Sequence, residues 1–361
     1  MLTPRKGILE IFPYVPGKSS IEGKQKSTKL SANESALGPS PRALSAFRDA
    51  ENSLHLYQDG TAIELRGALG LANGLNPDRI VCGAGSDELL YNLARGYAGP
   101  GDEILFGEYG FNVYPIVAHC VGAKPVKVPE RNLTFDVDAT LAQVTEKTRI
   151  VFIANPNNPT GSYIPAEELV RLRTGLREDI LLVIDCAYAE FVTSANYNIG
   201  FDLVDGGENT VVTRTFSKIY ALASLRIGWA FCPLSIADVL NRIRAPFNLS
   251  TASQLAGKAA VEDVGHVAAA RDHNTVWLPW LRDRLTECGL MVYPSVANFL
   301  LVRFPNDVAH NSQAAMAFFS SKGLILRETS IYGLPECLRV TVGKEEAMKA
   351  LAVNAKEFMA K

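Results

Sequence analysis

Between residues 80 and 215 the sequence alternates short apolar runs with segments of helical periodicity. The apolar runs include RIVC, DEILFG, RIVFIA and ILLVID, and each is too short for a helix but long enough for a strand. Such alternation predicts an α/β fold with a large, mostly parallel mixed sheet between helices. Sheets of this kind bind ligands at the carboxyl ends of their strands, so functional side chains are expected there.

The sequence pattern changes near the segment RAPFNLSTASQ, residues 244–254, after which helices and strands follow in a different order. A chain of 361 residues with 47% hydrophobic content is long enough for two cores. We therefore expect an N-terminal arm over residues 1–28 that packs over the active site, a large domain over residues 29–245 and a smaller α+β domain over residues 246–361. The arm is rich in Pro, Gly and Lys and has little periodicity.

Charge and cysteine content exclude several classes of function. The 36 basic and 38 acidic residues give a net charge of −2 without a basic stripe, which argues against nucleic acid as a partner. No apolar run approaches the roughly 18 residues of a membrane span, and the first residues lack a signal-peptide pattern. Six dispersed cysteines without a C-x-x-C pair indicate reduced thiols and no metal site. We expect a cytoplasmic protein.

The segment CGAGSDELL places two glycines after a predicted strand and Ser86 at the start of a predicted helix. Free backbone N–H groups and the positive end of the helix dipole make such a turn an anion site. It lacks the third glycine of a dinucleotide fingerprint and the Gly-Lys-Ser/Thr of a nucleotide P-loop. An ordinary strand-to-helix turn therefore remains an alternative interpretation.

Two further segments place polar side chains at predicted strand ends. ANPNNPTG holds Asn158 in a loop made rigid by two prolines, although Asn and Pro also occur in plain turns. LLVIDCAYAEF ends an apolar run on Asp185, with Tyr188 three residues later. A buried carboxylate requires a cation or a proton, and the alternative for Asp185 is a helix cap.

The segment TFSKIYALASLRIGW places Lys218 directly after the predicted strand VVTRT. Lys218 and Asp185 can therefore reach the same edge of a parallel sheet. A lysine that is partly desolvated there and close to Arg226 has a lowered amine pKa, which makes it a nucleophile or a Schiff-base former. The alternative is a lysine whose amine extends from a helix end into water.

The four motifs occur in the order Gly-x-Gly-Ser, Asn-Pro-x-Asn-Pro-Thr-Gly, Asp-x-x-Tyr and Ser-Lys followed by Arg226. In this order the chain resembles the fold-type I, aspartate-aminotransferase-like enzymes that use pyridoxal 5′-phosphate, and within them the histidinol-phosphate aminotransferases. The resemblance extends from about Tyr14 to Val342 and includes LSANESALGPSP, LYQDG and LRVTVG. It implies transfer of an amino group from L-histidinol phosphate to 2-oxoglutarate.

The resemblance also implies a role for each residue at the cofactor. Lys218 would bind the cofactor covalently and later carry the proton between the substrate Cα and the cofactor. Asp185 would face the pyridine nitrogen, where its negative charge keeps that nitrogen protonated. Tyr188 and Asn158 would hydrogen-bond the phenolic oxygen, and Tyr109 would stack on the ring.

The resemblance places the cofactor phosphate at the start of the helix that begins with Ser86. The implied phosphate contacts are the backbones of Gly85, Ser86 and Asp87 together with the side chains of Ser217 and Arg226. We expect the acidic side chains of Asp87 and Glu88 to point away from this anion.

Further implied contacts concern the substrate and a neighbouring subunit. The implied substrate contacts are Tyr14, Asn33, Arg327 and Arg339. Tyr57 matches a family tyrosine that reaches the cofactor phosphate of the neighbouring subunit, so a homodimer with shared active sites is expected. Two departures from the family pattern lie close to these motifs: Leu56-Tyr57-Gln58 replaces Arg-Tyr-Pro, and Cys186 replaces a common Glu.

Other functions remain open at this point. Aromatic amino acid aminotransferases share nearly all of the cofactor motifs, and threonine-phosphate decarboxylases keep the same lysine, aspartate and phosphate ligands. A cofactor-binding transcription regulator would need an N-terminal DNA-binding domain, for which an arm of about 28 residues is too short.

Overall fold

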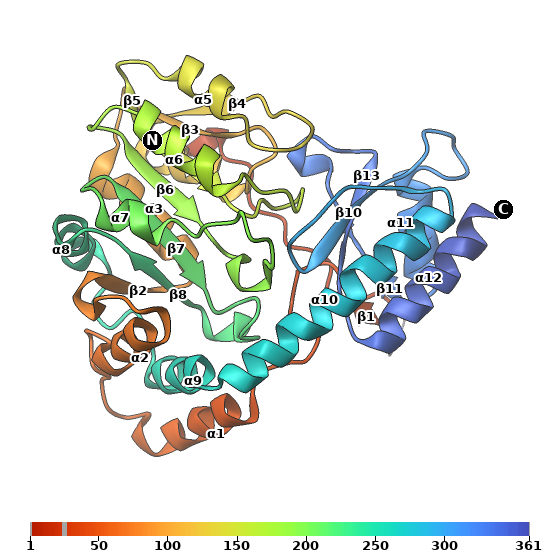
Figure 1. Cartoon of the computed structure of the whole chain (residues 1–361), viewed down its shortest axis with the longest axis horizontal. Coiled ribbons are helices and arrows are strands. Elements are labelled where there is room, and N and C mark those ends of the chain that lie inside the picture. The colour runs from red at the N-terminus through yellow and green to blue at the C-terminus, as the bar shows by residue number, and fades with distance from the viewer. Residues whose placement is uncertain (1, 24–26, 361) are drawn as a thin grey trace.

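The computed structural model describes residues 2–23 and 27–360. Figure 1 shows a large part built around one twisted sheet and a smaller C-terminal part, joined by the long helix α10 (Val264–Glu287). Among the helices of the described residues, none is both long enough and apolar enough to cross a membrane.

The large part contains a seven-stranded sheet in the order β2-β8-β7-β6-β5-β3-β4. β8 is antiparallel to both of its neighbours, whereas the other pairs are parallel. The predicted mostly parallel mixed sheet is thus confirmed. The strands are β2 (Ile80–Ala84), β3 (Glu103–Gly107), β4 (Lys124–Val128), β5 (Thr148–Ala154), β6 (Leu181–Asp185), β7 (Thr210–Thr215) and β8 (Ile227–Phe231).

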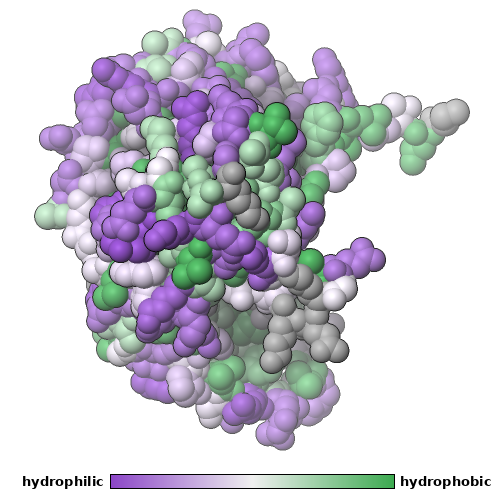
Figure 2. Space-filling view, turned by 90° about the vertical axis from the view of Figure 1, so that its right-hand side faces the viewer, coloured by the Kyte–Doolittle hydropathy of each residue, from purple (hydrophilic) through white to green (hydrophobic). Residues whose placement is uncertain are grey.

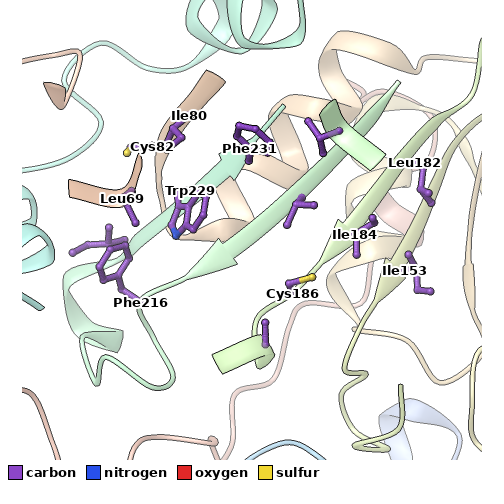
Figure 3. Packing of buried hydrophobic residues seen from close by; sticks show 14 of the residues in the cluster. Leu69, Ile80, Cys82, Ile153, Leu182, Ile184, Cys186, Phe216, Trp229 and Phe231 are labelled. Atoms are coloured by element: carbon purple, nitrogen blue, oxygen red, sulfur yellow. The ribbon is translucent and has the colours of Figure 1, made fainter. Parts of the chain in front are cut away.

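The central strands β6 and β7 are buried along their whole length because helices cover both faces of the sheet. Every residue of β6 and β7 is buried. One face carries α3 (Ser86–Tyr97), α4 (Val113–Val121) and α8 (Leu234–Ile243). The other carries α2 (Ile63–Asn73), α5 (Val137–Gln143), α6 (Ala166–Gly175), α7 (Phe201–Asp205) and α9 (Thr251–Glu262). Figure 3 shows the core on this second face, where Trp229 and Phe231 of β8 lie beside Leu69 and Ile80.

The smaller part has a four-stranded antiparallel sheet in the order β12-β13-β10-β9. Its strands are β9 (Met291–Val292), β10 (Phe299–Arg303), β12 (Arg327–Glu328) and β13 (Cys337–Thr341). Helices α10, α11 (Ser312–Ser321) and α12 (Glu345–Met359) share one apolar core with this sheet.

The N-terminal segment links the two parts. Gly7 lies against His119 of α4 in the large part, whereas β1 (Thr28–Lys29) pairs with β11 (Leu324–Ile325) in the smaller part, as Figure 1 shows. The chain then returns to the large part through α1 (Pro41–Asp49), which packs on α9. The domain boundaries expected at residues 28 and 245 stay a prediction.

Gly228 of β8 allows the start of α3 to approach the sheet closely. A Cβ atom at this position would overlap the backbone nitrogen of Ser86 and the carbonyl carbon of Gly85. The neighbouring Gly85 has φ +82°, a left-handed conformation that favours glycine. The close approach places the free N–H groups of α3 beside the end of β7.

We predict that Gly228→Ala lowers the free energy of unfolding by about 1–3 kcal/mol, because an added methyl group must displace the start of α3. The matched control is Gly67→Ala in α2, where an added Cβ meets no atom within 4 Å and alanine favours the helix. Thermal unfolding of both variants tests this expectation. Equal unfolding temperatures would show that α3 shifts without cost.

Candidate active site

A cavity of about 290 Å³ lies at the carboxyl ends of β5, β6 and β7, between the two parts of the chain. Ala154, Asp185 and Thr215, the last residues of these three strands, all contribute to its wall. The structure therefore brings most of the predicted site residues to one place. Those that line the cavity are Tyr14, Asn33, Ser86, Asp87, Asn158, Asp185, Tyr188, Ser217, Lys218, Arg226, Arg327 and Arg339.

Lys218 lies three residues beyond the end of β7, with its amine in the cavity wall. Its Nζ donates to the backbone oxygen of Ala32 at 3.3 Å and lies 5.6 Å from the ring centre of Tyr188. Burial, together with the nearby positive charge of Arg339, lowers the pKa of the Lys218 amine to about 8. A substantial fraction of this amine is therefore unprotonated just above neutral pH.

Asp185 is the last residue of β6 and is buried at the base of the cavity. Its Oδ2 accepts from the Tyr114 hydroxyl at 3.0 Å, and its Oδ1 accepts from the Thr213 hydroxyl at 3.2 Å. Burial raises the pKa of this carboxyl to about 6, although both hydroxyl groups oppose the shift. The group is thus mainly ionised at neutral pH and can pair with a cation.

Tyr114 of α4 and Thr213 of β7 were not expected from the sequence. Tyr114 stacks on Phe152 of β5 with ring centres 4.9 Å apart. The sequence alone predicts that a tyrosine on the sheet-facing side of an apolar helix is an ordinary core residue. Only its hydroxyl, aimed at Asp185, gives it a place in the site.

Tyr188 and Asn158 take part in a network that joins both parts of the chain. Asn33 Nδ2 donates to the Tyr188 hydroxyl at 2.9 Å, and Thr341 of β13 donates to Asn33 Oδ1 at 3.1 Å. Asn158 Oδ1 accepts a hydrogen bond from Arg339, which also lies in β13. The loop after β5 and the strand β13 thus form adjoining walls of the cavity.

Ser86, Ser217 and Arg226 form an electropositive end of the cavity. Arg226 Nη1 donates to Ser217 Oγ at 3.3 Å, and the guanidinium lies so close to Gly85 that a Cβ there would overlap it. The free N–H groups at the start of α3 face the same space, which suits a bound anion.

The acidic side chains beside this end behave differently from each other. Glu88 points away, as expected, because its Oε2 accepts from Ala84 N and from Asn248 Nδ2. The expectation for Asp87 is wrong, since its Oδ2 forms an ion pair with Arg226 Nη2 at 3.1 Å. The guanidinium attracts the carboxylate, and an acidic side chain in the first turn of a helix is itself favourable.

Arg327 and Arg339 lie directly opposite each other on the paired strands β12 and β13. They are only 7% and 4% exposed, and both line the cavity. Arg327 donates to the backbone oxygen of Val15 at 2.9 Å, and Arg339 donates to that of Ser31 at 2.7 Å. Like charges opposite each other are unfavourable, and partial burial increases the cost. The pair therefore forms a site for a strongly negative ligand.

Tyr14 brings the N-terminal arm into the same wall. It lines the cavity beside both arginines, and burial, with the neighbouring Tyr332 next in effect, raises the pKa of its hydroxyl. The hydroxyl is therefore a hydrogen-bond donor over the whole neutral range.

Three predicted residues do not line the cavity. Gly85 directly precedes α3, and Tyr57 is 83% exposed and stacked on Phe247. Tyr109 packs near Leu133, Leu301 and Leu334. Phe111, which sequence reasoning missed, contributes an aromatic side chain to the cavity wall. The stacking role of Tyr109 stays a prediction, and Phe111 is a second candidate for it.

Residues 25–354 match the family described as aminotransferase class I and II. The chain belongs to the class I and II aminotransferases. The family resemblance seen in the motifs is therefore confirmed.

Two curated aminotransferases match over nearly the whole chain. The histidinol-phosphate aminotransferase of Paramagnetospirillum magneticum is 54% identical, over 99% of this chain and 98% of the relative. That of Rhodopseudomonas palustris strain BisB18 is 52% identical over the same shares.

Solved aminotransferase structures share the fold. A crystal structure of histidinol-phosphate aminotransferase from Sinorhizobium meliloti in complex with pyridoxal-5′-phosphate matches with a TM-score of 0.87 and 29% identity, over 94% of this chain and 92% of that chain. Thermus thermophilus aspartate aminotransferase with maleate matches with a TM-score of 0.80 and 21% identity, over 92% of each chain. The likeness to the Thermus thermophilus enzyme concerns the fold alone.

We predict that Lys218→Met stabilises the ligand-free aminotransferase against heat at pH 7, because a neutral side chain avoids the burial of a charge. The Lys218 pKa falls from 10.5 in the unfolded chain to about 8 in the folded protein. The unfolded wild type therefore binds more protons between these values, and wild-type stability rises with pH there. The stability that Lys218→Met gains over wild type should therefore be largest below pH 8 and decrease toward pH 10.5.

Unfolding temperatures measured from pH 7 to pH 10.5 test this expectation. The control is Lys349→Met, whose amine lies on the exposed surface of α12 in an ion pair with Glu345. A gain from Lys218→Met that does not vary with pH would show that packing, and not charge, causes it.

Proposed function

We propose that this aminotransferase uses pyridoxal 5′-phosphate to transfer the amino group of L-histidinol phosphate to 2-oxoglutarate, which yields imidazole acetol phosphate and L-glutamate. The reaction is a step of histidine biosynthesis. The observation that carries the substrate class is the buried pair Arg327 and Arg339, opposite each other in one cavity with Lys218 and Asp185. The names of the two curated relatives above support the choice of donor.

The residues of the cavity fit this cofactor. A buried carboxylate at one wall, a lysine with a lowered pKa and a helix start with Arg226 and Ser217 match a pyridine nitrogen, an aldehyde and a phosphate in turn. When bound, pyridoxal phosphate supplies an electron sink and a carrier for the amino group. Asp185 would hold the proton on the pyridine nitrogen, since its carboxyl is mainly ionised at neutral pH.

Lys218 has two tasks in this proposal. Its amine would hold the aldehyde carbon of the cofactor, and as a free amine it would carry a proton at the substrate Cα. A pKa near 8 suits both tasks, because the unprotonated amine is a nucleophile and a base. The carbonyl of Ala32 keeps the amine directed into the cavity.

Arg327 and Arg339 would bind the substrate anion. A guanidinium pairs through two parallel hydrogen bonds with either phosphate or carboxylate, so one pair of arginines can serve the donor and the acceptor in turn. Tyr14 adds a hydroxyl donor for the phosphate from the arm. Asn33, held by Tyr188 and Thr341, completes the wall between these groups and Lys218.

Two other reactions fit the same cofactor contacts. An aromatic amino acid aminotransferase would also use 2-oxoglutarate, and a threonine-phosphate decarboxylase would also bind a phosphate. They differ in their requirements, because a decarboxylase releases carbon dioxide and needs no amino acceptor.

We predict that the purified protein forms L-glutamate from 2-oxoglutarate when L-histidinol phosphate is the donor, and that Lys218→Ala abolishes this turnover while the far-UV circular dichroism stays unchanged. Lys349→Ala on the surface of α12 is the matched control. A large preference in kcat/KM for phenylalanine or tyrosine would overturn the choice of donor. Release of carbon dioxide without 2-oxoglutarate would overturn the reaction class.

The active protein in this proposal is a cytoplasmic homodimer. Tyr57 is exposed, is stacked on Phe247 with ring centres 4.7 Å apart and does not line the cavity of its own chain. Leu54 and Leu56 beside it are also exposed apolar side chains, which are typical of contact surfaces. Figure 2 shows further hydrophobic residues on a segment that projects from the body of the molecule. A partner subunit would cover these side chains, and Tyr57 would donate to the phosphate bound there.

We predict that Tyr57→Phe weakens cofactor affinity about tenfold, because it removes one hydrogen bond to a charged group while keeping the aromatic ring. Mixed dimers of a Tyr57→Phe chain and a Lys218→Ala chain then contain one site with both groups intact. Activity at limiting cofactor should exceed the sum of the two separate variants. A simple sum would place Tyr57 in the site of its own chain.

A further inference from the structure

Lys29 and Glu34 form an ion pair at the mouth of the cavity, and the proposed cofactor and anion contacts do not use it. Lys29 Nζ lies 2.6 Å from Glu34 Oε1, and both residues contribute to the cavity wall. Their side chains are 29% and 43% exposed. An ion pair as open to solvent as this contributes little to stability, so its position calls for another explanation.

The backbone on either side fixes where this pair lies. Ala32 O accepts from the Lys218 amine, and Asn33 in a left-handed conformation, φ +56°, donates to the Tyr188 hydroxyl. Glu34 therefore follows directly after two residues that touch the proposed catalytic groups. Asn298 Nδ2 also binds the backbone oxygen of Asn33 at 3.1 Å, which holds the turn in place.

The N-terminal arm covers the same turn. Ser31 Oγ donates to the backbone oxygen of Lys18 at 2.9 Å, and Gly17 lies so close that a Cβ there would be 3.1 Å from Ser31 Oγ. The arm thus brings Tyr14 and the pair of Lys29 and Glu34 to the same opening of the cavity.

The carboxylates of the cavity wall, within the described residues, are Glu34, Asp87 and Asp185. Asp185 lies at the base with Tyr114, and Asp87 is paired with Arg226. Glu34 is the remaining carboxylate, and its counterion is a flexible lysine. The wall therefore offers both a negative and a positive group at one point, and the proposed contacts to the cofactor and to the substrate anion use neither of them.

The two proposed substrates differ in their second substituent. Each has one anion for Arg327 and Arg339, the donor phosphate or the acceptor carboxylate next to the carbonyl. The donor then carries an imidazole with an N–H group and an ordinary pKa near 6.5. The acceptor carries a second carboxylate in the corresponding place. One subsite must therefore accept an N–H donor and an anion in alternate half-reactions.

We propose that Lys29 and Glu34 form this subsite. Glu34 accepts a hydrogen bond from the imidazole N–H of the donor, and Lys29 donates to the distal carboxylate of the acceptor. In each half-reaction one member of the pair binds the substrate. The other member remains a partial counterion and stays exposed to water. The inference rests on the proposed function, because it concerns the substrates named there.

Binding of unreactive ligands to the holoenzyme tests the role of Glu34. The probes are 3-(imidazol-4-yl)propyl phosphate and 3-phenylpropyl phosphate, which lack the amine and differ only in the ring. We expect calorimetry to show that wild type prefers the imidazole probe and that Glu34→Ala reduces the preference about tenfold, the effect of one hydrogen bond to a charged group. Glu345→Ala is the matched control, since its ion pair with Lys349 is also 2.6 Å long but lies on α12. An unchanged preference in Glu34→Ala would overturn the assignment.

Lys29→Met provides the second measurement. We expect it to keep the preference for the imidazole probe while kcat/KM for 2-oxoglutarate falls about tenfold. Unfolding temperatures close to that of wild type show that both variants fold. An equal loss for donor and acceptor in either variant would overturn the subsite. Wild-type turnover of histidinol phosphate with an unchanged probe preference in Glu34→Ala refutes the subsite alone, whereas the absence of wild-type turnover refutes the proposed function and the subsite with it.

Discussion

The burial of two opposite charges at adjacent strand ends governs the architecture of this site. β6 and β7 are parallel, so Asp185 at the end of one and Lys218 just beyond the other open onto the same cavity. The low polarity of the buried site moves the pKa values of the two side chains toward each other, to about 6 for Asp185 and about 8 for Lys218. The hydroxyls of Tyr114 and Thr213 and the carbonyl of Ala32 compensate for the loss of water around both groups. A helix, a strand and a loop each supply one of these partners, since Tyr114 lies in α4, Thr213 in β7 and Ala32 in the loop after β1.

Much of this arrangement could be predicted from the sequence because it depends on the order of strands. Apolar runs of four to six residues separated by helical periodicity are enough to predict a mostly parallel sheet. A polar residue at or just beyond the end of a strand then lies at the ligand-binding edge, which places Asp185, Asn158 and Lys218 together. The local sequence also predicted the helix start at Ser86, since a glycine pair after a strand indicates a close turn.

Other features depend on the direction of a side chain or on pairing between segments that are distant in the sequence. The periodicity of apolar residues carries no information on either. The ring of Tyr114 belongs to the apolar core, whereas its hydroxyl contacts Asp185. Phe111 and Tyr109 are two residues apart in the sequence, but Phe111 lines the cavity and Tyr109 packs near Leu133, Leu301 and Leu334. The pairing of Asp87 with Arg226 reverses a direction expected from the repulsion between this carboxylate and a neighbouring anion. The ion pair of Lys29 and Glu34 joins the cavity only because β1 pairs with β11 of the other part.

The cross-strand arginine pair makes the choice of ligand depend on main-chain registry. β12 is only two residues long, and its hydrogen bonds to β13 set Arg327 opposite Arg339. Because successive side chains of a strand point to opposite faces, a slip of one residue would turn Arg327 away from the cavity and bring Glu328 toward it. The charge presented to an incoming molecule would then change sign at that position. The short ladder between β12 and β13 therefore acts as the element that encodes which anions the cleft admits.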